Sequence, residues 1–188
     1  MANSPPEPDG GAVAGLPAVR RIVTATNPEG RSYIAEDGPA PHVITVEERP
    51  GYRNTNLWRV LGRIDEPDTT ADQRGVLPPN GGVVVRTVDF PPMAASEEER
   101  KRGAAAVFSK MFPDASHDAD SKRSPGMHTT DTVDFAVLLE GEVVAVLDDD
   151  ETVMRAGDVL IQRGTSHAWE NRTQKMARML FVLCDAER

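Results

Sequence analysis

The chain has 188 residues and carries 30 acidic against 21 basic side chains, a formal net charge of −9. This length suits one domain around one core, and the charge argues against a nucleic-acid partner bound through its phosphates. The lack of a long apolar run or a signal-like start argues against a membrane partner. We therefore expect a cytoplasmic protein whose single cysteine, Cys184, excludes an internal disulfide.

Residues 1–17 are rich in proline, glycine and small side chains, which predicts a disordered N-terminal arm. Residues 18–188 would then form a single domain. The 15 glycines and 15 prolines favour many short strands. In the first half of the chain we expect strands over 20–24, 31–36, 42–47, 56–61 and 83–90, with a long polar loop over 65–82.

One helix is predicted over 97–111. Ser96 and Glu99 form a capping box, in which each side chain can satisfy a free backbone N–H of the other. An apolar stripe follows at helical spacing, and Pro113 ends the helix. The stripe consists of Ala104, Val107, Phe108 and Met111.

Strands dominate the second half after a polar stretch over 114–125, in which scattered aspartates lack the spacing of a calcium loop. Short strands separated by turns are typical of a β-sandwich or a small barrel. The strands expected here cover 135–139, 143–147, 152–154, 159–162, 167–170 and 178–184.

Two of the four histidines, His128 and His167, lie in informative surroundings. Side chains of equal parity share one face of a strand, so His128, Thr130 and Asp134 would face the same interior. Six residues of strand, however, span about 20 Å. Parity alone therefore does not show a metal site, and a bend between Thr130 and Asp134 would be needed to bring these side chains together.

The region 126–171 resembles the two motifs of the cupin superfamily, and the flanking strands extend the resemblance to about 83–185. His128 stands at the first motif histidine, Thr130 at the second, and Asp134 at the glutamate. His167 matches the histidine of the second motif, where Gln162 replaces the proline. The other matches are Gly141, Gly157, Gly164 and Asn171. The chain is most similar to small single-domain cupins.

The resemblance implies an all-β fold, a single antiparallel jelly-roll barrel with extra N-terminal strands and one short helix. Such added strands would expose an edge, so a homodimer is expected. The resemblance also implies one divalent metal ion, held by His128, Asp134 and His167. Two histidines and one carboxylate suit Fe(II), and Zn, Mn or Ni are also compatible with these ligands.

The function implied by the resemblance is a metal-dependent enzyme acting on an aromatic, polyketide-like or carbonyl-containing small molecule. A dehydratase or lyase and a dioxygenase both fit. Thr130 would orient a water or a substrate oxygen. Gln162 would support the loop before His167 or bind substrate, and Trp169 would pack or stack on substrate. The alternatives are a metal-free cupin that binds or senses a small molecule, and a structural protein with a filled barrel.

Simpler interpretations remain for individual residues. Asp134 could pair with Arg163 or Arg172 instead of a metal ion. Asn171 would fix a turn, and Cys184 would act as a small buried hydrophobe. Trp58 and Phe90 are expected in the core, and His42 and His117 on the surface.

Overall fold

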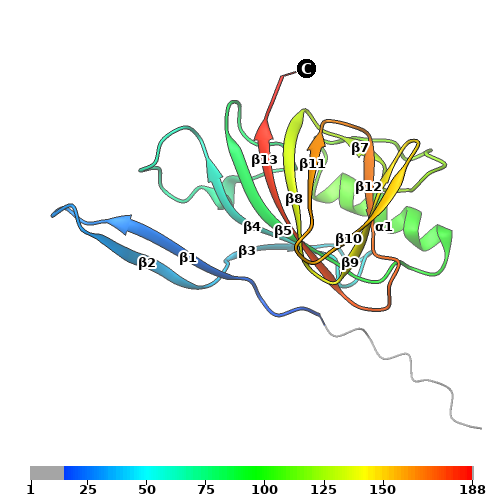
Figure 1. The fold of residues 1–188 in the computed structure, drawn as a ribbon, viewed down its shortest axis with the longest axis horizontal. Coiled ribbons are helices and arrows are strands. Elements are labelled where there is room, and N and C mark those ends of the chain that lie inside the picture. Colours follow the sequence, from blue (N-terminus) through cyan, green and yellow to red (C-terminus); the bar gives the residue numbers. More distant parts are fainter. Residues whose placement is uncertain (1–14, 188) are drawn as a thin grey trace, which may run out of the picture.

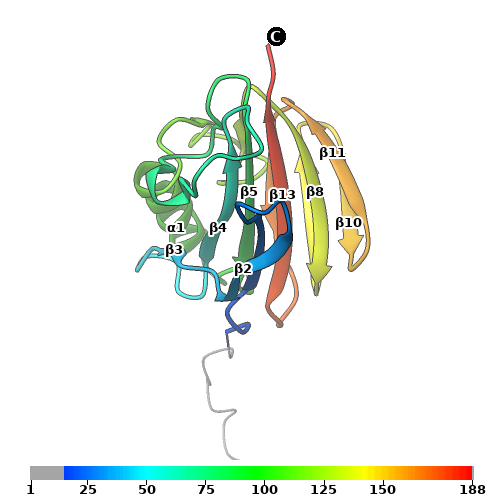
Figure 2. The same cartoon turned by 90° about the vertical axis from the view of Figure 1, so that its left-hand side faces the viewer.

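The computed structural model describes residues 15–187 and shows two antiparallel sheets that curve around a shared interior (Figure 1). A helix lies along one flank of the sheets, and a two-stranded hairpin projects from the other end (Figures 1 and 2). This architecture confirms the all-β jelly-roll barrel predicted from the sequence, with its extra N-terminal strands and one short helix.

Most strands fall within a few residues of their predicted positions. The two-residue strands β6 and β7, and the 3-10 turn η1 (Thr70–Asp72), were not predicted. The six-stranded sheet has the order β11 (Val159–Arg163), β8 (Thr132–Glu140), β13 (Ala177–Asp185), β5 (Val83–Phe90), β4 (Arg53–Val60), β3 (His42–Thr45). The five-stranded sheet has the order β10 (Glu151–Arg155), β9 (Glu142–Leu147), β12 (His167–Glu170), β7 (His128–Thr129), β6 (Ser116–His117).

Alternation along the strands directs side chains into the interior between the sheets. On β8 the inward positions are Thr132, Asp134, Ala136 and Leu138, all of them buried. The chain crosses from the five-stranded to the six-stranded sheet between Thr129 and Thr132. This crossing is the bend that the parity argument required, so His128 and Asp134 reach one interior from opposite sheets.

Helix α1 (Glu97–Lys110) begins at the predicted cap. The Ser96 hydroxyl oxygen accepts from the Glu99 backbone N–H at 3.2 Å and donates to the Glu99 carboxylate at 2.8 Å. The predicted apolar stripe is buried along its whole length. Among the described residues, no helix is long and apolar enough to cross a membrane.

Replacing Ser96 by alanine is expected to lower the free energy of unfolding by about 1 kcal/mol, because it leaves a backbone N–H of the first turn without its acceptor. Denaturant unfolding measures the change. Ser109→Ala is the matched control, since the exposed Ser109 hydroxyl bonds only to the Ala106 carbonyl within the same helix. Equal losses in both variants would show that the cap contributes nothing.

The N-terminal hairpin pairs β1 (Arg20–Thr26) with β2 (Ser32–Pro39). Residues 1–14 of the predicted arm lie outside the described residues. The last residues of that arm are held by the barrel, because the Leu16 and Pro17 carbonyls accept hydrogen bonds from Arg53, and Pro17 also from Arg178.

Exposed apolar side chains gather on the hairpin and on the outer face of β8 and β11. They include Ile22, Tyr33, Ile34, Phe135, Leu139, Val159 and Ile161. The predicted homodimer would bury such surface. The homodimer itself stays a prediction.

Several side chains differ from their predicted surroundings. His117, expected on the surface, stacks on Phe108 with ring centroids 4.0 Å apart and bonds to the Pro125 carbonyl through Nε2. Trp58, expected in the core, is half-buried beside Arg21. Cys184 is also only half-buried, whereas Phe90 is a core residue as predicted.

Candidate functional site

An inner cavity of about 60 Å³ lies between the two sheets. Five of the six predicted site residues line it: His128, Thr130, Asp134, His167 and Trp169. The sixth, Gln162, stands behind His167. The remaining walls are Tyr52, Val76, Arg86, Val88, Phe90, Phe112, Phe181 and Leu183. The cavity therefore combines polar groups from both sheets with an aromatic lining.

His128 and His167 form a close pair, with ring centroids 4.2 Å apart, because the two residues sit opposite each other on β7 and β12. The Nδ1 atom of His128 lies 2.9 Å from the Gly126 carbonyl oxygen, which can only accept a hydrogen bond. The ring proton of neutral His128 is therefore on Nδ1, and the backbone of His167 is a second hydrogen-bond partner of this ring. Burial lowers the pKa of His128, so the ring is neutral at pH 7.

His167 has a hydrogen-bond partner for either tautomer. The Gln162 amide nitrogen, 2.7 Å from Nδ1, donates when the ring proton is on Nε2. The Thr165 carbonyl oxygen, 2.9 Å from Nδ1, accepts when the proton is on Nδ1. Gln162 also bonds to Thr165 itself, so it supports the loop before His167, as expected. Burial, with the neighbouring His128, lowers the pKa of His167 to about 3.

The Asp134 carboxyl group is buried, and its Oδ1 atom has no hydrogen-bond partner among residues 15–187. Burial raises the pKa of Asp134 from 3.8 to about 6, against the opposing effects of Thr132 and Arg86. The alternative pairing with Arg172 is wrong, because that guanidinium binds Glu151 and Glu170. No ion pair joins Asp134 to Arg163 in the described part of the chain either. Asp134 can thus exist protonated near neutral pH.

Arg86 is a site residue that sequence reasoning missed. Its side chain is 2% exposed and donates to the Gly75 and Val76 carbonyls. Burial lowers the pKa of Arg86 to about 10, so it remains charged at pH 7. Within residues 15–187 no carboxylate lies within ion-pair distance of it, and its Nε atom has no partner. A signal existed, since Arg86 interrupts an apolar strand on its inward face.

The predicted metal site does not assemble as a three-ligand centre. Among the described residues, no group of three or more His, Cys, Asp and Glu side chains is arranged to hold a metal ion. The two histidines meet, but the Asp134 carboxylate interacts with Thr132 and Arg86 rather than with either ring. The donor set present therefore does not fit the implied ion.

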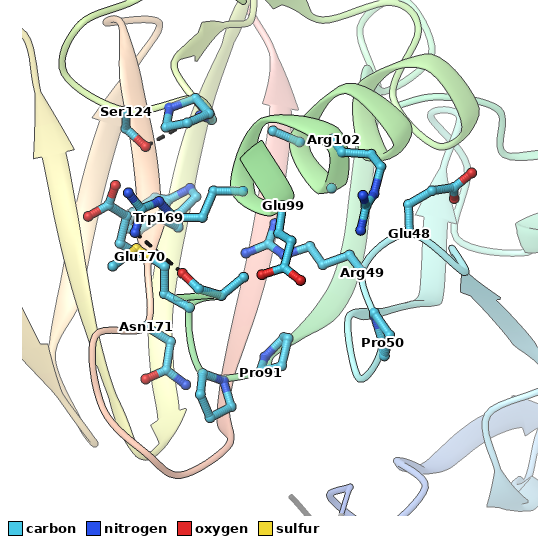
Figure 3. A pocket seen from close by; sticks show the side chains of 18 of the residues that line it. Glu48, Arg49, Pro50, Pro91, Glu99, Arg102, Ser124, Trp169, Glu170 and Asn171 are labelled. Atoms are coloured by element: carbon cyan, nitrogen blue, oxygen red, sulfur yellow. Dashed lines mark hydrogen bonds between the residues drawn. The ribbon is translucent and has the colours of Figure 1, made fainter. Parts of the chain in front are cut away.

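A larger outer cleft of about 310 Å³ shares the side chain of Trp169 with the inner cavity, and Figure 3 shows the residues that line this cleft. It is bounded by the β3–β4 loop, the segment after β5, α1, the segment before β7 and the end of β12. Trp169 lines both spaces and packs edge-on against His167 and Phe181, at centroid distances of 5.4 and 5.5 Å. Asn171 fixes the adjoining turn by donating to the Phe90 and Lys175 carbonyls.

Comparison with known proteins identifies relatives over most of the chain. A family model described as "Cupin domain" matches residues 119–183. The cupin-domain-containing oxidoreductase virC of Hypocrea virens is 38% identical over 190 residues, covering 92% of this chain and 79% of that protein. Phomopsin biosynthesis cluster protein C′ of Diaporthe leptostromiformis is 44% identical over 63 residues, which cover 32% of this chain and only 33% of that protein.

A Cupin 2 conserved barrel domain protein from Salinispora arenicola is among the similar solved structures. It has a TM-score of 0.42 and 16% sequence identity, and the match covers 76% of this chain and 82% of that one.

Proposed function

This chain belongs to the cupin family, and we propose that it is a biosynthetic enzyme that removes water from a β-hydroxy carbonyl compound. One observation carries the proposal. In the described part of the chain, a single cavity holds a guanidinium without an ion-paired carboxylate, two neutral imidazoles, and a carboxyl group with one oxygen that has no hydrogen-bond partner. These groups can polarise a carbonyl, accept a proton and donate a proton.

The first step is deprotonation next to the carbonyl. Arg86 binds the carbonyl oxygen and stabilises the negative charge that develops on it, which is most effective in a cavity that excludes water. The Nε2 atom of His128 takes the proton from the neighbouring carbon. The neutral rings of His128 and His167 are both available for this step because burial keeps them unprotonated.

The second step is departure of the hydroxyl group. Protonated Asp134 donates its proton to the leaving oxygen, the carbon–oxygen bond breaks, and the electron pair left by deprotonation forms the carbon–carbon double bond. Water leaves, and the proton held by the imidazole returns to the Asp134 carboxylate. Atoms and charges balance without a further reactant.

The other predicted site residues support this arrangement. The Thr130 hydroxyl, 2.7 Å from that of Thr132, holds the segment that joins the two sheets beside the cavity. Gln162 orients His167 from behind and lies outside the cavity lining. Trp169 forms the wall facing the outer cleft.

A second candidate is oxidation or reduction of the same class of substrate, which the names of relatives such as virC favour. The metal ion predicted from the sequence would suit a metal-dependent form of either candidate, with Fe as the ion for redox chemistry. Elemental analysis tests whether such an ion is bound. The wild type and His167→Ala are compared, both purified without added metal or chelator. One equivalent of Fe, Zn, Mn or Ni that is lost in the variant would support a metal enzyme.

Product analysis separates the candidates. The protein is incubated with β-hydroxyacyl N-acetylcysteamine thioesters and β-hydroxy ketones, with and without a chelator, and the products are examined by mass spectrometry. Loss of one water that survives chelation is expected. Gain of oxygen or a change of two hydrogens would favour the redox candidate. Binding without any conversion would favour the metal-free binding protein.

A further inference from the structure

We infer that the outer cleft binds a carboxylate group at the far end of the same substrate, and that Arg49 recognises it. This inference rests on the proposed function, since it assigns the substrate class for that site. The substrate would carry its reacting carbonyl in the inner cavity, an apolar middle past Trp169, and a carboxylate in the cleft.

Arg49 is positioned for such a role. It extends from the β3–β4 loop into the cleft, towards the wall that holds Trp169 and Glu170 (Figure 3). Its guanidinium carbon lies 4.4 Å from the centroid of the Tyr52 ring, which itself lines the inner cavity. A tight turn fixes its backbone, because the Arg49 N–H donates to the Val46 carbonyl and its carbonyl accepts from Tyr52.

The guanidinium of Arg49 has no hydrogen bond or ion pair in the described part of the chain. A stacked, preoriented guanidinium with free N–H donors is suited to a planar, bidentate acceptor such as a carboxylate.

Helix α1 leaves room for this side chain. A Cβ atom on Gly103 would lie 3.4 Å from the Cβ of Arg49 and 3.4 Å from the Glu48 carbonyl oxygen, at the lower limit of ordinary van der Waals contact. Glycine inside a helix lowers stability by about 1 kcal/mol relative to alanine. Its presence here lets the helix pack directly against the stem of Arg49.

Two of the acidic side chains of the cleft form ion pairs with basic residues other than Arg49. Glu170 binds Arg172 at 2.8 Å. Glu48 binds Lys110 and also interacts with Arg102, and Glu99 accepts from the Ser96 hydroxyl. Arg49 feels the charge of Glu170 but forms no ion pair with it in the described part of the chain, so its N–H donors can bind an anionic ligand.

One ligand that reaches both spaces would pass the side chain that they share. Trp169 lines both, and Gly126, which lines the cleft, holds His128 through its carbonyl oxygen. The inner cavity of about 60 Å³ admits only the reacting end of a molecule, whereas the cleft of about 310 Å³ is the size of a small ligand pocket. Pro50 and Pro91 add apolar walls for the middle of the ligand.

Binding of two probes tests the inference without depending on turnover. Phenylbutanoate and its uncharged analogue phenylbutanamide are titrated into the protein, and calorimetry measures the affinity of each. In a Trp58→Phe background, a change in Trp169 fluorescence shows that binding occurs near this side chain. The carboxylate is expected to bind more tightly than the amide. Arg49→Met should weaken carboxylate binding at least about tenfold and leave amide binding unchanged.

Two further variants complete the design. Arg123→Met is the matched control, because that guanidinium binds the Leu147 and Asp150 carbonyls outside the cleft. Arg49→Lys keeps the positive charge but lacks the planar guanidinium that donates two hydrogen bonds. Its affinity for the carboxylate should lie between those of Arg49→Met and the wild type. Equal affinities for acid and amide, or equal losses in Arg49→Met and Arg123→Met, would overturn the inference. An Arg49-dependent preference for the acid without any water elimination would uphold this site and reject the proposed reaction.

Discussion

Replacing Arg86 by methionine is expected to lower kcat for water elimination by about a hundredfold to a thousandfold, the usual effect of removing a donor to a developing oxyanion. Methionine keeps much of the side-chain volume but cannot bind the carbonyl oxygen. The measurement is kcat on a β-hydroxyacyl thioester at pH 7.

Arg59→Met is the matched control for this variant. Arg59 is half-buried, donates to the Thr69 carbonyl and, like Arg86, has a buried Nε atom without a partner, yet it lies outside the cavity lining. Since Arg86 is a buried cation without a carboxylate partner, its removal should leave the fold intact. Full turnover in Arg86→Met would contradict the role of this residue.

Replacing Asp134 by asparagine is expected to abolish elimination while stabilising the protein at high pH. The folded pKa of about 6 lies above the ordinary value of 3.8, so between these values the folded state holds a proton that the unfolded state has lost. The native stability therefore falls as pH rises through this window, by about 3 kcal/mol in total. Asparagine is neutral throughout and avoids this loss.

Denaturant unfolding at pH 4 and pH 8 measures the effect. Asp134→Asn should resemble the wild type at pH 4 and exceed its free energy of unfolding at pH 8. Asp158→Asn, which alters a carboxylate that accepts from the Arg155 backbone in an exposed turn, should show no such gain. A wild-type stability that does not fall between pH 4 and pH 8 relative to Asp134→Asn would show that Asp134 is not held protonated.

Local signals predicted the elements of the fold well. The capping box at Ser96 placed the start of α1 because a helix N-terminus is satisfied by neighbours in sequence. Apolar strands bounded by turn residues likewise identified β5, β12 and most others. The two-residue strands β6 and β7 were not predicted, because two residues are too few to show a sequence pattern. Their pairing depends on partners that the fold brings together.

The site was only partly predictable. Motif spacing selected His128, Asp134 and His167, but it could not show that the charge of Arg86 acts on the Asp134 carboxyl group in the same cavity. Strand parity would have put Arg86 on an inward face, but the sequence analysis did not use it, and nothing local distinguishes a catalytic arginine from a structural one. Arg49 lies on the β3–β4 loop, which lines the same cleft as the end of β12. Nothing in the local sequence indicates that these two segments meet.

The measurement that tests the proton-transfer chemistry most directly is deuterium exchange followed by proton NMR. A β-hydroxyacyl thioester is incubated in D₂O with chelator-treated wild type and with Asp134→Asn. We expect the wild type to exchange the protons next to the carbonyl and to eliminate water, and Asp134→Asn to exchange these protons without elimination. Neither exchange nor elimination in the wild type, or loss of both activities on chelation, would contradict proton abstraction by the residues of this cavity.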